Sequence, residues 1–455
     1  MITELLWALS MGLAGALVFA AIGLVSGTDE TSTLGPLTLL VVLLGVPPEG
    51  VITFFLAGAA AKHMTHAIPT TLLGIPGDTT AVPLLDDARA MRRIGAPHIA
   101  LRKALAGGLL SAAIAVPVAV AVAALLAPLA DPVKEIVPYV FVAVAALVAY
   151  FSPGRWAAVA GLVPFVLALA ALSGFAKDVL DKPLSISFFL GIAIGPLVID
   201  VLMAGSRTGR GLLPRGGGKV FSLAPEGAAP GGWFPNPFRV LTRGQTAATA
   251  ATAAVSSTTF MLSPVATAVM AGEAVGSRIK HPYQRLSTLM SVKNGTTEST
   301  YIAETLIPLI AFGLPLSPVA AGPAAALFNA PPVYTVEAPG GGVHNLHTLL
   351  STWQFLVFGL LAVAIAAVVV YPLAVRHART ASAWVSRRIS HEALIGAFAG
   401  LICVVAWYEG GPLALLVTLT VGALAGACHR LLGMTSGAQY MGYYVATLFV
   451  PLLIG

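Results

Sequence analysis

Two uncharged apolar runs constrain this chain more than any other feature. Residues 109–130 and 355–375 are each long enough to cross the roughly 30 Å hydrocarbon layer of a bilayer as a helix of about 20 residues. Charged residues make up 10% of the chain, against roughly 25% in a typical soluble domain. Because a chain in lipid must pair its own backbone groups, we predict an all-α polytopic membrane protein with about 10–12 transmembrane helices.

Basic residues lie between the apolar segments and predict the orientation of the chain. They gather at 89–103, 207–243, 278–285 and 376–388, and loops rich in Lys and Arg remain on the cytoplasmic side. The net charge of +6 is therefore a topology signal, and we predict no nucleic-acid partner. Alternating spans are expected near 104–127, 136–151, 156–173, 185–204, 348–375, 391–408, 411–430 and 438–454.

A Gly- and Pro-rich basic stretch at 206–243 divides the chain. Its composition is typical of a linker, and its basic residues place it in the cytoplasm. We predict an N-terminal membrane repeat at 1–205, a second membrane repeat at 244–346, and C-terminal helices at 347–455 that complete the second half.

Two segments place helix-breaking residues within apolar surroundings. The stretches "TTLLGIPGDTTAVP" (70–83) and "TLIPLIAFGLPLSP" (305–318) share an apolar approach followed by a Gly-apolar-Pro step. Arg89, Arg92 and Arg93 follow the first, whereas residues 329–345 after the second contain no Lys or Arg, so the two should face opposite sides. This pattern predicts two re-entrant or broken-helix hairpins in an inverted repeat, an architecture that many secondary transporters use to place a substrate.

The two breaks imply a cavity, because irregular backbone survives at membrane depth only where protein or water surrounds it. A helix that restarts there presents free amides and a partial positive charge, which suit a carboxylate. The predicted substrate-binding residues are Gly74, Pro76, Gly77, Asp78, Thr79, Thr80, Asn294, Thr296, Thr297, Ser299, Gly313, Pro315 and Ser317. The alternative is that these residues form interfacial turns or proline kinks packed between helices.

Four acids near the expected membrane depth are candidates for coupling transport to an ion gradient. They are Asp29, Asp78, Glu298 and Glu304. An ionisable group is costly inside a membrane and by default indicates a function. Either protonation or a bound sodium ion would neutralise such a group, and the sequence does not choose between H⁺ and Na⁺. No other cofactor is expected.

Lys62, His63 and His66 form a short polar cluster before the first break. The two histidines have no adjacent third ligand, so no metal site is expected, and we predict that they contact an anion or lie at the interface. For Lys62 and Lys293 we favour interfacial side chains that snorkel over an attraction for anionic substrate. No hydrolase, kinase or ATPase motif is present, and we predict that the chain is not an enzyme.

The stretches "LLGIPGDTTAVPLLDDARAMRRIGAP" (72–97) and "GTTESTYIAETLIPLIAFGLP" (295–315) resemble two blocks of the large membrane subunit of the tripartite tricarboxylate transporter family. The likeness spans most of residues 1–330. The first GIPG motif of that family corresponds to Gly74, Ile75, Pro76 and Gly77, and its second to Gly313, Leu314 and Pro315, with Leu316 in place of the last glycine.

This resemblance implies a multi-pass permease of the bacterial or archaeal inner membrane that takes up carboxylates by ion-driven symport. It also implies two partners, a small four-helix membrane subunit and a periplasmic substrate-binding protein. We therefore predict a secondary active transporter for tri- or dicarboxylates, in contact with membrane lipid and working by alternating access around the two breaks. The alternative is a non-transporting membrane scaffold or assembly subunit. Whether the chain forms a homodimer is left open.

Overall fold

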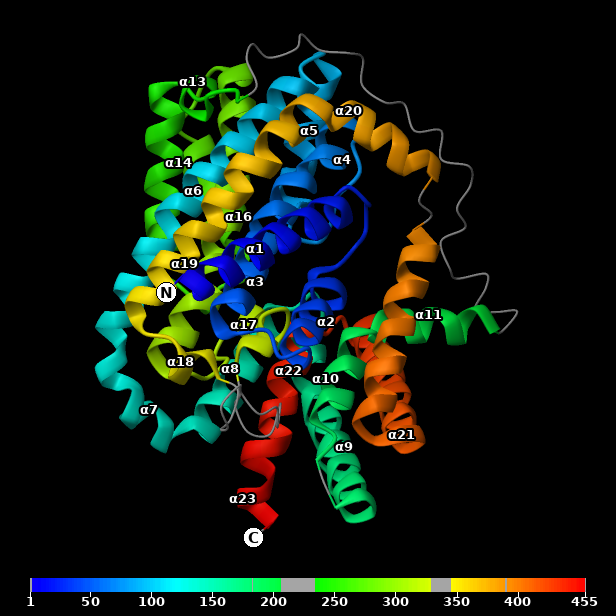
Figure 1. Ribbon diagram of the computed structural model, residues 1–455. Helices are drawn as coiled ribbons and strands as arrows, with labels where there is room; N and C mark the ends of the chain where they lie inside the picture. Colours follow the sequence, from blue (N-terminus) through cyan, green and yellow to red (C-terminus); the bar gives the residue numbers. More distant parts are fainter. Residues whose placement is uncertain (1, 182, 206–233, 329–344, 389–390, 455) are drawn as a thin grey trace.

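The computed structural model describes residues 2–181, 183–205, 234–328, 345–388 and 391–454, and these residues form helices and turns without strands (Figure 1). The first half contains α1 Ile2–Gly23, α2 Glu30–Leu43, α3 Pro48–Thr65, α4 Ala67–Leu72, α5 Leu85–Arg93, α6 Pro97–Leu126, α7 Ala130–Glu135, α8 Val137–Phe151, α9 Trp156–Leu180, α10 Ser185–Ala193 and α11 Gly195–Gly205. The second half contains α13 Pro237–Val240, α14 Arg243–Ser256, α15 Pro264–Gly276, α16 Pro282–Phe312, α17 Pro318–Ala321, α18 Leu346–Leu349, α19 Thr352–Ile365, α20 Tyr371–Arg388, α21 His391–Leu432, α22 Ser436–Tyr444 and α23 Val450–Ile454. Short helical turns lie at η1 Val82–Leu84, η2 Ala127–Leu129, η3 Ala325–Leu327, η4 Ala366–Val370 and η5 Val445–Phe449.

Five helical stretches of the described chain are long and apolar enough to cross a bilayer, namely Ile2–Gly23, Pro97–Val133, Trp156–Leu180, Thr352–Val385 and Gly396–Leu432. The predicted all-α polytopic class is thus confirmed, whereas the total of about 10–12 spans stays a prediction. The span expected near 185–204 consists of α10 and α11, which are bent by 63° relative to each other. The boundary expected between 408 and 411 coincides with non-helical backbone at Gly410 and Gly411, within α21.

Both predicted breaks interrupt helices. The segment after α4 includes Gly74 with φ of +71°, and α16 ends at Gly313 with φ of +64°, a conformation that glycine adopts without strain. Figure 1 places α4 and α5 near one end of the molecule and α17 nearer its middle. The inverted repeat itself stays a prediction, as do the four domain boundaries. Residues 206–233 of the expected linker lie outside the described residues.

The long helices α6 and α16 pack against each other through small residues. A Cβ atom at Gly107 would lie 2.3 Å from the carbonyl oxygen of Ser291, and one at Gly295 would lie 2.3 Å from the hydroxyl oxygen of Ser111. Helices in lipid associate chiefly through close van der Waals packing, which small residues permit. This contact holds α16 beside α6 (Figure 1). Ser291 and Gly295, the α16 residues at the contact, lie where the polar run of that helix begins.

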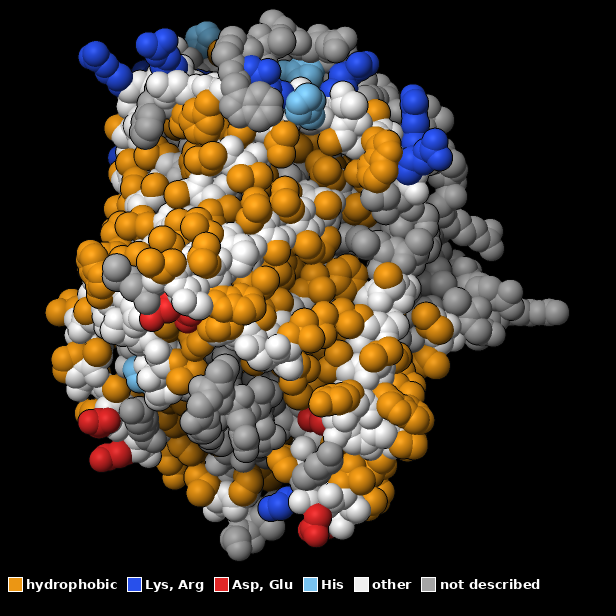
Figure 2. Space-filling view, in the orientation of Figure 1, with side chains coloured by type: hydrophobic (Ala, Val, Ile, Leu, Met, Phe, Trp, Pro, Cys, Tyr) orange, Lys and Arg blue, Asp and Glu red, His pale blue; other side chains and the backbone are white. Residues whose placement is uncertain are grey.

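Charged side chains are unevenly distributed along the molecule. On the face that Figure 2 shows, Lys and Arg gather at the end that holds α5, α13 and α20, and a band of hydrophobic side chains separates this end from acidic side chains farther along. Because loops rich in Lys and Arg remain in the cytoplasm, this end is the expected cytoplasmic one.

Candidate functional site

The first break encloses its own backbone groups in protein. The amide of Gly77 donates to the Thr70 hydroxyl at 3.1 Å, and its carbonyl accepts from the Gly27 amide at 2.6 Å. The Ser26 hydroxyl donates to the carbonyl of Pro76 at 2.5 Å. Irregular backbone at this depth is therefore paired with the segment that connects α1 to α2, as a chain in lipid requires.

A buried ion pair joins α3 to the segment after this break. The Lys62 ammonium donates to Asp78 Oδ2 at 2.8 Å and to the carbonyl of Thr28 at 3.0 Å. On the other side, His66 Nδ1 lies 3.0 Å from Asp78 Oδ1, which also accepts from the amide of Ala81 at 3.0 Å. Lys62 and His66 are 0% exposed, and Asp78 is 4% exposed. Free amides were expected where the helix restarts, but the amide of Ala81 there donates to the carboxylate of Asp78.

His63 stands between two carboxylates from different helices. Its Nε2 lies 2.5 Å from Glu30 Oε1 at the start of α2, and its Nδ1 lies 2.7 Å from Glu298 Oε2 in the middle of α16. His63 is 1% exposed, and the ring of Tyr301 packs edge-on against it with the centroids 4.7 Å apart. The other histidine also reaches α16, because His66 Nε2 lies 3.2 Å from Asn294 Oδ1.

These side chains form one ionic network in which acids outnumber the permanent cation. Its charged members are the carboxylates of Glu30, Asp78 and Glu298 and the ammonium of Lys62, which leaves a net charge of −2 when both histidines are neutral. Unpaired charge is costly in a buried site. A proton on His63 would lie between two carboxylates and reduce this excess, so the geometry favours a protonated His63 imidazole in this conformation.

The second break is organised around Glu304. The Glu304 Oε2 atom accepts from the amide of Val319 at 3.1 Å, and the Ser317 hydroxyl donates to the Glu304 carbonyl at 2.7 Å. Ser317 also caps α17 by accepting from the amide of Ala320 at 3.0 Å. The other carboxyl oxygen of Glu304, Oε1, is buried without a hydrogen-bond partner among the described residues. Here too the amides at the helix start are occupied by the chain's own side chains.

The structure brings together some of the predicted residues and separates others. Asp78, Thr80, Asn294 and Glu298 meet in the ionic network, and Thr79 binds Asp29 at its edge with 3.1 Å between the oxygens. Gly74, Pro76 and Gly77 shape the first break, whereas Gly313, Pro315, Ser317 and Glu304 belong to the second. Thr296, Thr297 and Ser299 lie within α16, which runs unbroken through the polar run.

The structure corrects the interfacial environment expected for Lys62, whereas anion contact, the other expectation for the two histidines, stays a prediction. Neither Lys62 nor His66 is at the interface, and Lys62 does not snorkel, since its ammonium is paired with Asp78 inside the protein. Lys293 is also paired, with Asp87 at 2.5 Å. Glu30, not its neighbour Asp29, contacts the histidine. The sequence did contain a signal for this buried cluster. Lys62, His63 and His66 lie together at the end of a helix of small residues, shortly before the first break.

A family model described as the tripartite tricarboxylate transporter TctA family matches residues 9–439. The match covers nearly the whole chain, including both breaks and every member of the ionic network. No curated protein and no solved structure matches the chain at a significant level.

Proposed function

The chain belongs to the tripartite tricarboxylate transporter TctA family, and from this premise we propose that it moves organic carboxylates across the membrane together with protons. Membership makes it a membrane component of a transport system, not an enzyme. The finer proposal is a secondary transporter that accumulates tri- or dicarboxylates in the cell by symport and works by alternating access. The chain would lie in the inner membrane. Its partners would be a small four-helix membrane subunit and a periplasmic substrate-binding protein.

The observation that supports proton coupling is the position of His63. Two carboxylates, from α2 and α16, lie at 2.5 and 2.7 Å from its two ring nitrogens. A histidine changes charge near neutral pH, and its affinity for a proton depends on the charges beside it. A movement that separates His63 from Glu298 would weaken its hold on the proton. The same movement would part α3 from α16.

This arrangement suggests how a proton and a substrate share one cycle. While His63 is protonated, it links α2 and α3 to α16 and offsets one of the two carboxylate charges. After the proton leaves, the two carboxylates repel each other across the site, and the packed arrangement is disfavoured. Proton release and helix separation would therefore occur together, which is the coupling that a symporter needs.

The substrate-binding role predicted for residues at the two breaks remains a proposal, except that Asp78 is now assigned to proton coupling alone. The ionic network contains no unpaired cation among the described residues, since Lys62 is held by Asp78. We therefore assign Asp78 and Glu298 to proton coupling. Glu304 is the corresponding candidate at the second break, because one of its carboxyl oxygens is unpaired.

The experiment that tests this proposal is uptake of labelled citrate and succinate into proteoliposomes that contain the chain, with and without its companion subunits. We expect His63→Gln to lose accumulation driven by a pH gradient while retaining exchange of internal for external substrate. Lys280→Gln, which changes an exposed residue, is the matched control. A scaffold would show no uptake under any condition. Accumulation by His63→Gln at the wild-type level would refute proton coupling at this residue.

A further inference from the structure

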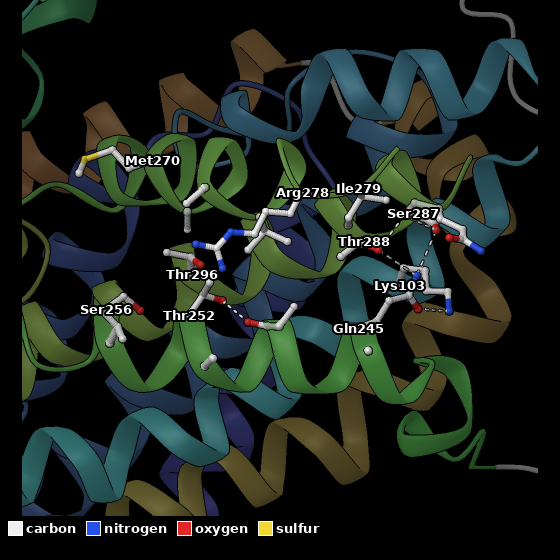
Figure 3. A pocket seen from close by; sticks show the side chains of 18 of the residues that line it. Lys103, Gln245, Thr252, Ser256, Met270, Arg278, Ile279, Ser287, Thr288 and Thr296 are labelled. Carbon is white, nitrogen blue, oxygen red and sulfur yellow. Dashed lines mark hydrogen bonds between the residues drawn. The ribbon is translucent and has the colours of Figure 1, made fainter. Parts of the chain in front are cut away.

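A large cavity lies beside α16, away from the ionic network. Its volume is about 1300 Å³, and it opens to the surface between α14, α15 and α16, with Lys103 of α6 at one end (Figure 3). The helices α14 and α15 contain 14 and 13 residues, so each is too short to span a bilayer. The cavity is thus the space between two short helices and the long helix on which both pack.

Paired hydroxyl groups hold the two short helices on α16. Thr249 donates to Ser291 at 3.1 Å, and Ser256 and Ser299 lie 2.6 Å apart between α14 and α16. On the α15 side, Thr300 donates to Thr267 at 3.1 Å. These hydroxyls are used in packing, so they fix the walls and leave little hydrogen-bonding capacity for a ligand.

Thr296 is different from its neighbours on α16. It lines the cavity, its side chain is 0% exposed, and its hydroxyl has no hydrogen-bond partner among the described residues. Thr297, Ser299 and Thr300 each donate to a backbone carbonyl of the preceding turn, as helical hydroxyls usually do. A buried hydroxyl without a partner is costly, and a bound group would relieve that cost.

Arg278 gives the cavity its charge. Its side chain extends from the end of α15 into the cavity and points towards Thr296 and Thr252 (Figure 3). No described residue forms an ion pair or hydrogen bond with its guanidinium. Among the described residues that line the cavity, none is Asp or Glu. At the far end, Lys103 already donates to the carbonyl of Val240 and to Gln245. The free positive charge is therefore a single guanidinium, suited to one carboxylate.

Most of the wall around this charge is apolar. Ala251, Val255, Leu262, Met270, Ala271 and Val275 line it. We propose that the cavity between α14, α15 and α16 binds an organic monocarboxylate with an apolar body, whose carboxylate pairs with Arg278 and accepts from Thr296. A tricarboxylate would place two further charges against side chains that cannot pair with them.

The position of Thr296 connects this cavity to transport, and this step rests on the proposed function. Residues two positions apart project about 200° apart around a helix. Asn294 and Glu298 contact the histidines of α3, so Thr296 between them faces the cavity on the other side of α16. One segment of α16 therefore touches both the proton-carrying network and the bound anion. A shift of α16 would alter both sites together.

The test is binding of labelled hexanoate to the purified full chain in nanodiscs of zwitterionic lipid, measured by scintillation proximity. Hexanol and citrate serve as competitors, since one lacks the charge and the other lacks the apolar body. We expect hexanoate to bind and neither competitor to displace it at equal concentration. Arg278→Gln should weaken binding about tenfold or more and Thr296→Val about threefold. Ala271→Phe, which places a bulky ring on the apolar wall of the cavity, should weaken binding, and Lys280→Gln should leave it unchanged.

Several results would overturn the inference. Displacement of hexanoate by equal citrate or hexanol would refute the proposed ligand class, and wild-type binding by both Arg278→Gln and Ala271→Phe would refute the location. Absence of hexanoate binding together with gradient-driven citrate uptake would refute this inference and leave the proposed function intact. Hexanoate binding without uptake of any carboxylate would do the reverse.

Discussion

Replacing Lys62 with methionine tests whether the ionic network is the buried structure described above. The substitution removes an ammonium that is 0% exposed and 2.8 Å from Asp78 Oδ2, while a side chain of similar length remains. Removal of one partner of a buried ion pair costs about 3–5 kcal/mol. His66 still contacts Asp78 after the change, so we expect a loss near the lower limit, about 3 kcal/mol.

The reverse substitution, Asp78→Asn, leaves Lys62 buried. The nearest remaining carboxylate is Glu30, with 3.9 Å between its Oε1 and the Lys62 nitrogen. We expect a loss of about 5 kcal/mol for this variant. The double variant removes both charges and should also lose about 5 kcal/mol, so that the coupling energy between the two sites is about 3 kcal/mol.

The assay is the free energy of unfolding in bicelles, measured by reversible denaturation with SDS. Lys293→Met is the matched control, because Lys293 pairs with Asp87 at 2.5 Å but both side chains are partly exposed, 14% and 13%. A partly solvated pair contributes about 1 kcal/mol or less. Additive losses in the double variant, or a loss for Lys62→Met no larger than that for Lys293→Met, would refute the buried pair.

Three further predictions follow from single contacts. Gly77→Ala should destabilise the protein by more than about 2 kcal/mol, because its Cβ would lie 2.4 Å from the carbonyl oxygen of His66. The control is Gly174→Ala, whose Cβ would have no atom within 4 Å and which should be neutral in the same SDS assay. Gly107→Ala should separate α6 from α16 and lower the unfolding midpoint, since its Cβ would lie 2.3 Å from a backbone oxygen; an unchanged midpoint would contradict this packing. Glu304→Gln should remain folded, because its amide oxygen can still accept from Val319, yet we expect it to lose gradient-driven uptake if Glu304 takes part in coupling; full uptake would remove it from the candidates.

The fold class and the two breaks could be predicted from sequence because both depend on local properties. Apolar runs of sufficient length indicate membrane helices, and α4 and α16 end within two residues of Gly74 and Gly313, each of which is followed two positions later by a proline. The bend between α10 and α11 was missed, since the apolar run continues through it. Length and hydropathy do not report a change of direction.

The ionic network could be predicted only in part, because its contacts are distant in sequence. Whether Lys62 is buried or snorkels depends on Asp78 and Thr28, which the fold brings to it. His63 and Glu298 are 235 positions apart, and no local pattern indicates that they meet. The acids near membrane depth were found because an ionisable group is costly there. Asp29 was predicted in place of Glu30, which contacts His63, because the sequence does not reveal the orientation of the first turn of α2.

The most direct test of proton-coupled carboxylate transport is the proton movement itself. Proteoliposomes with a pH-sensitive dye inside, with the membrane potential held at zero, would report the internal pH as labelled citrate or succinate enters. We predict that substrate addition acidifies the interior for the wild-type chain with its partners, and that Glu298→Gln exchanges substrate without moving protons. Entry of labelled carboxylate into wild-type proteoliposomes with no change of internal pH would contradict the proposed coupling.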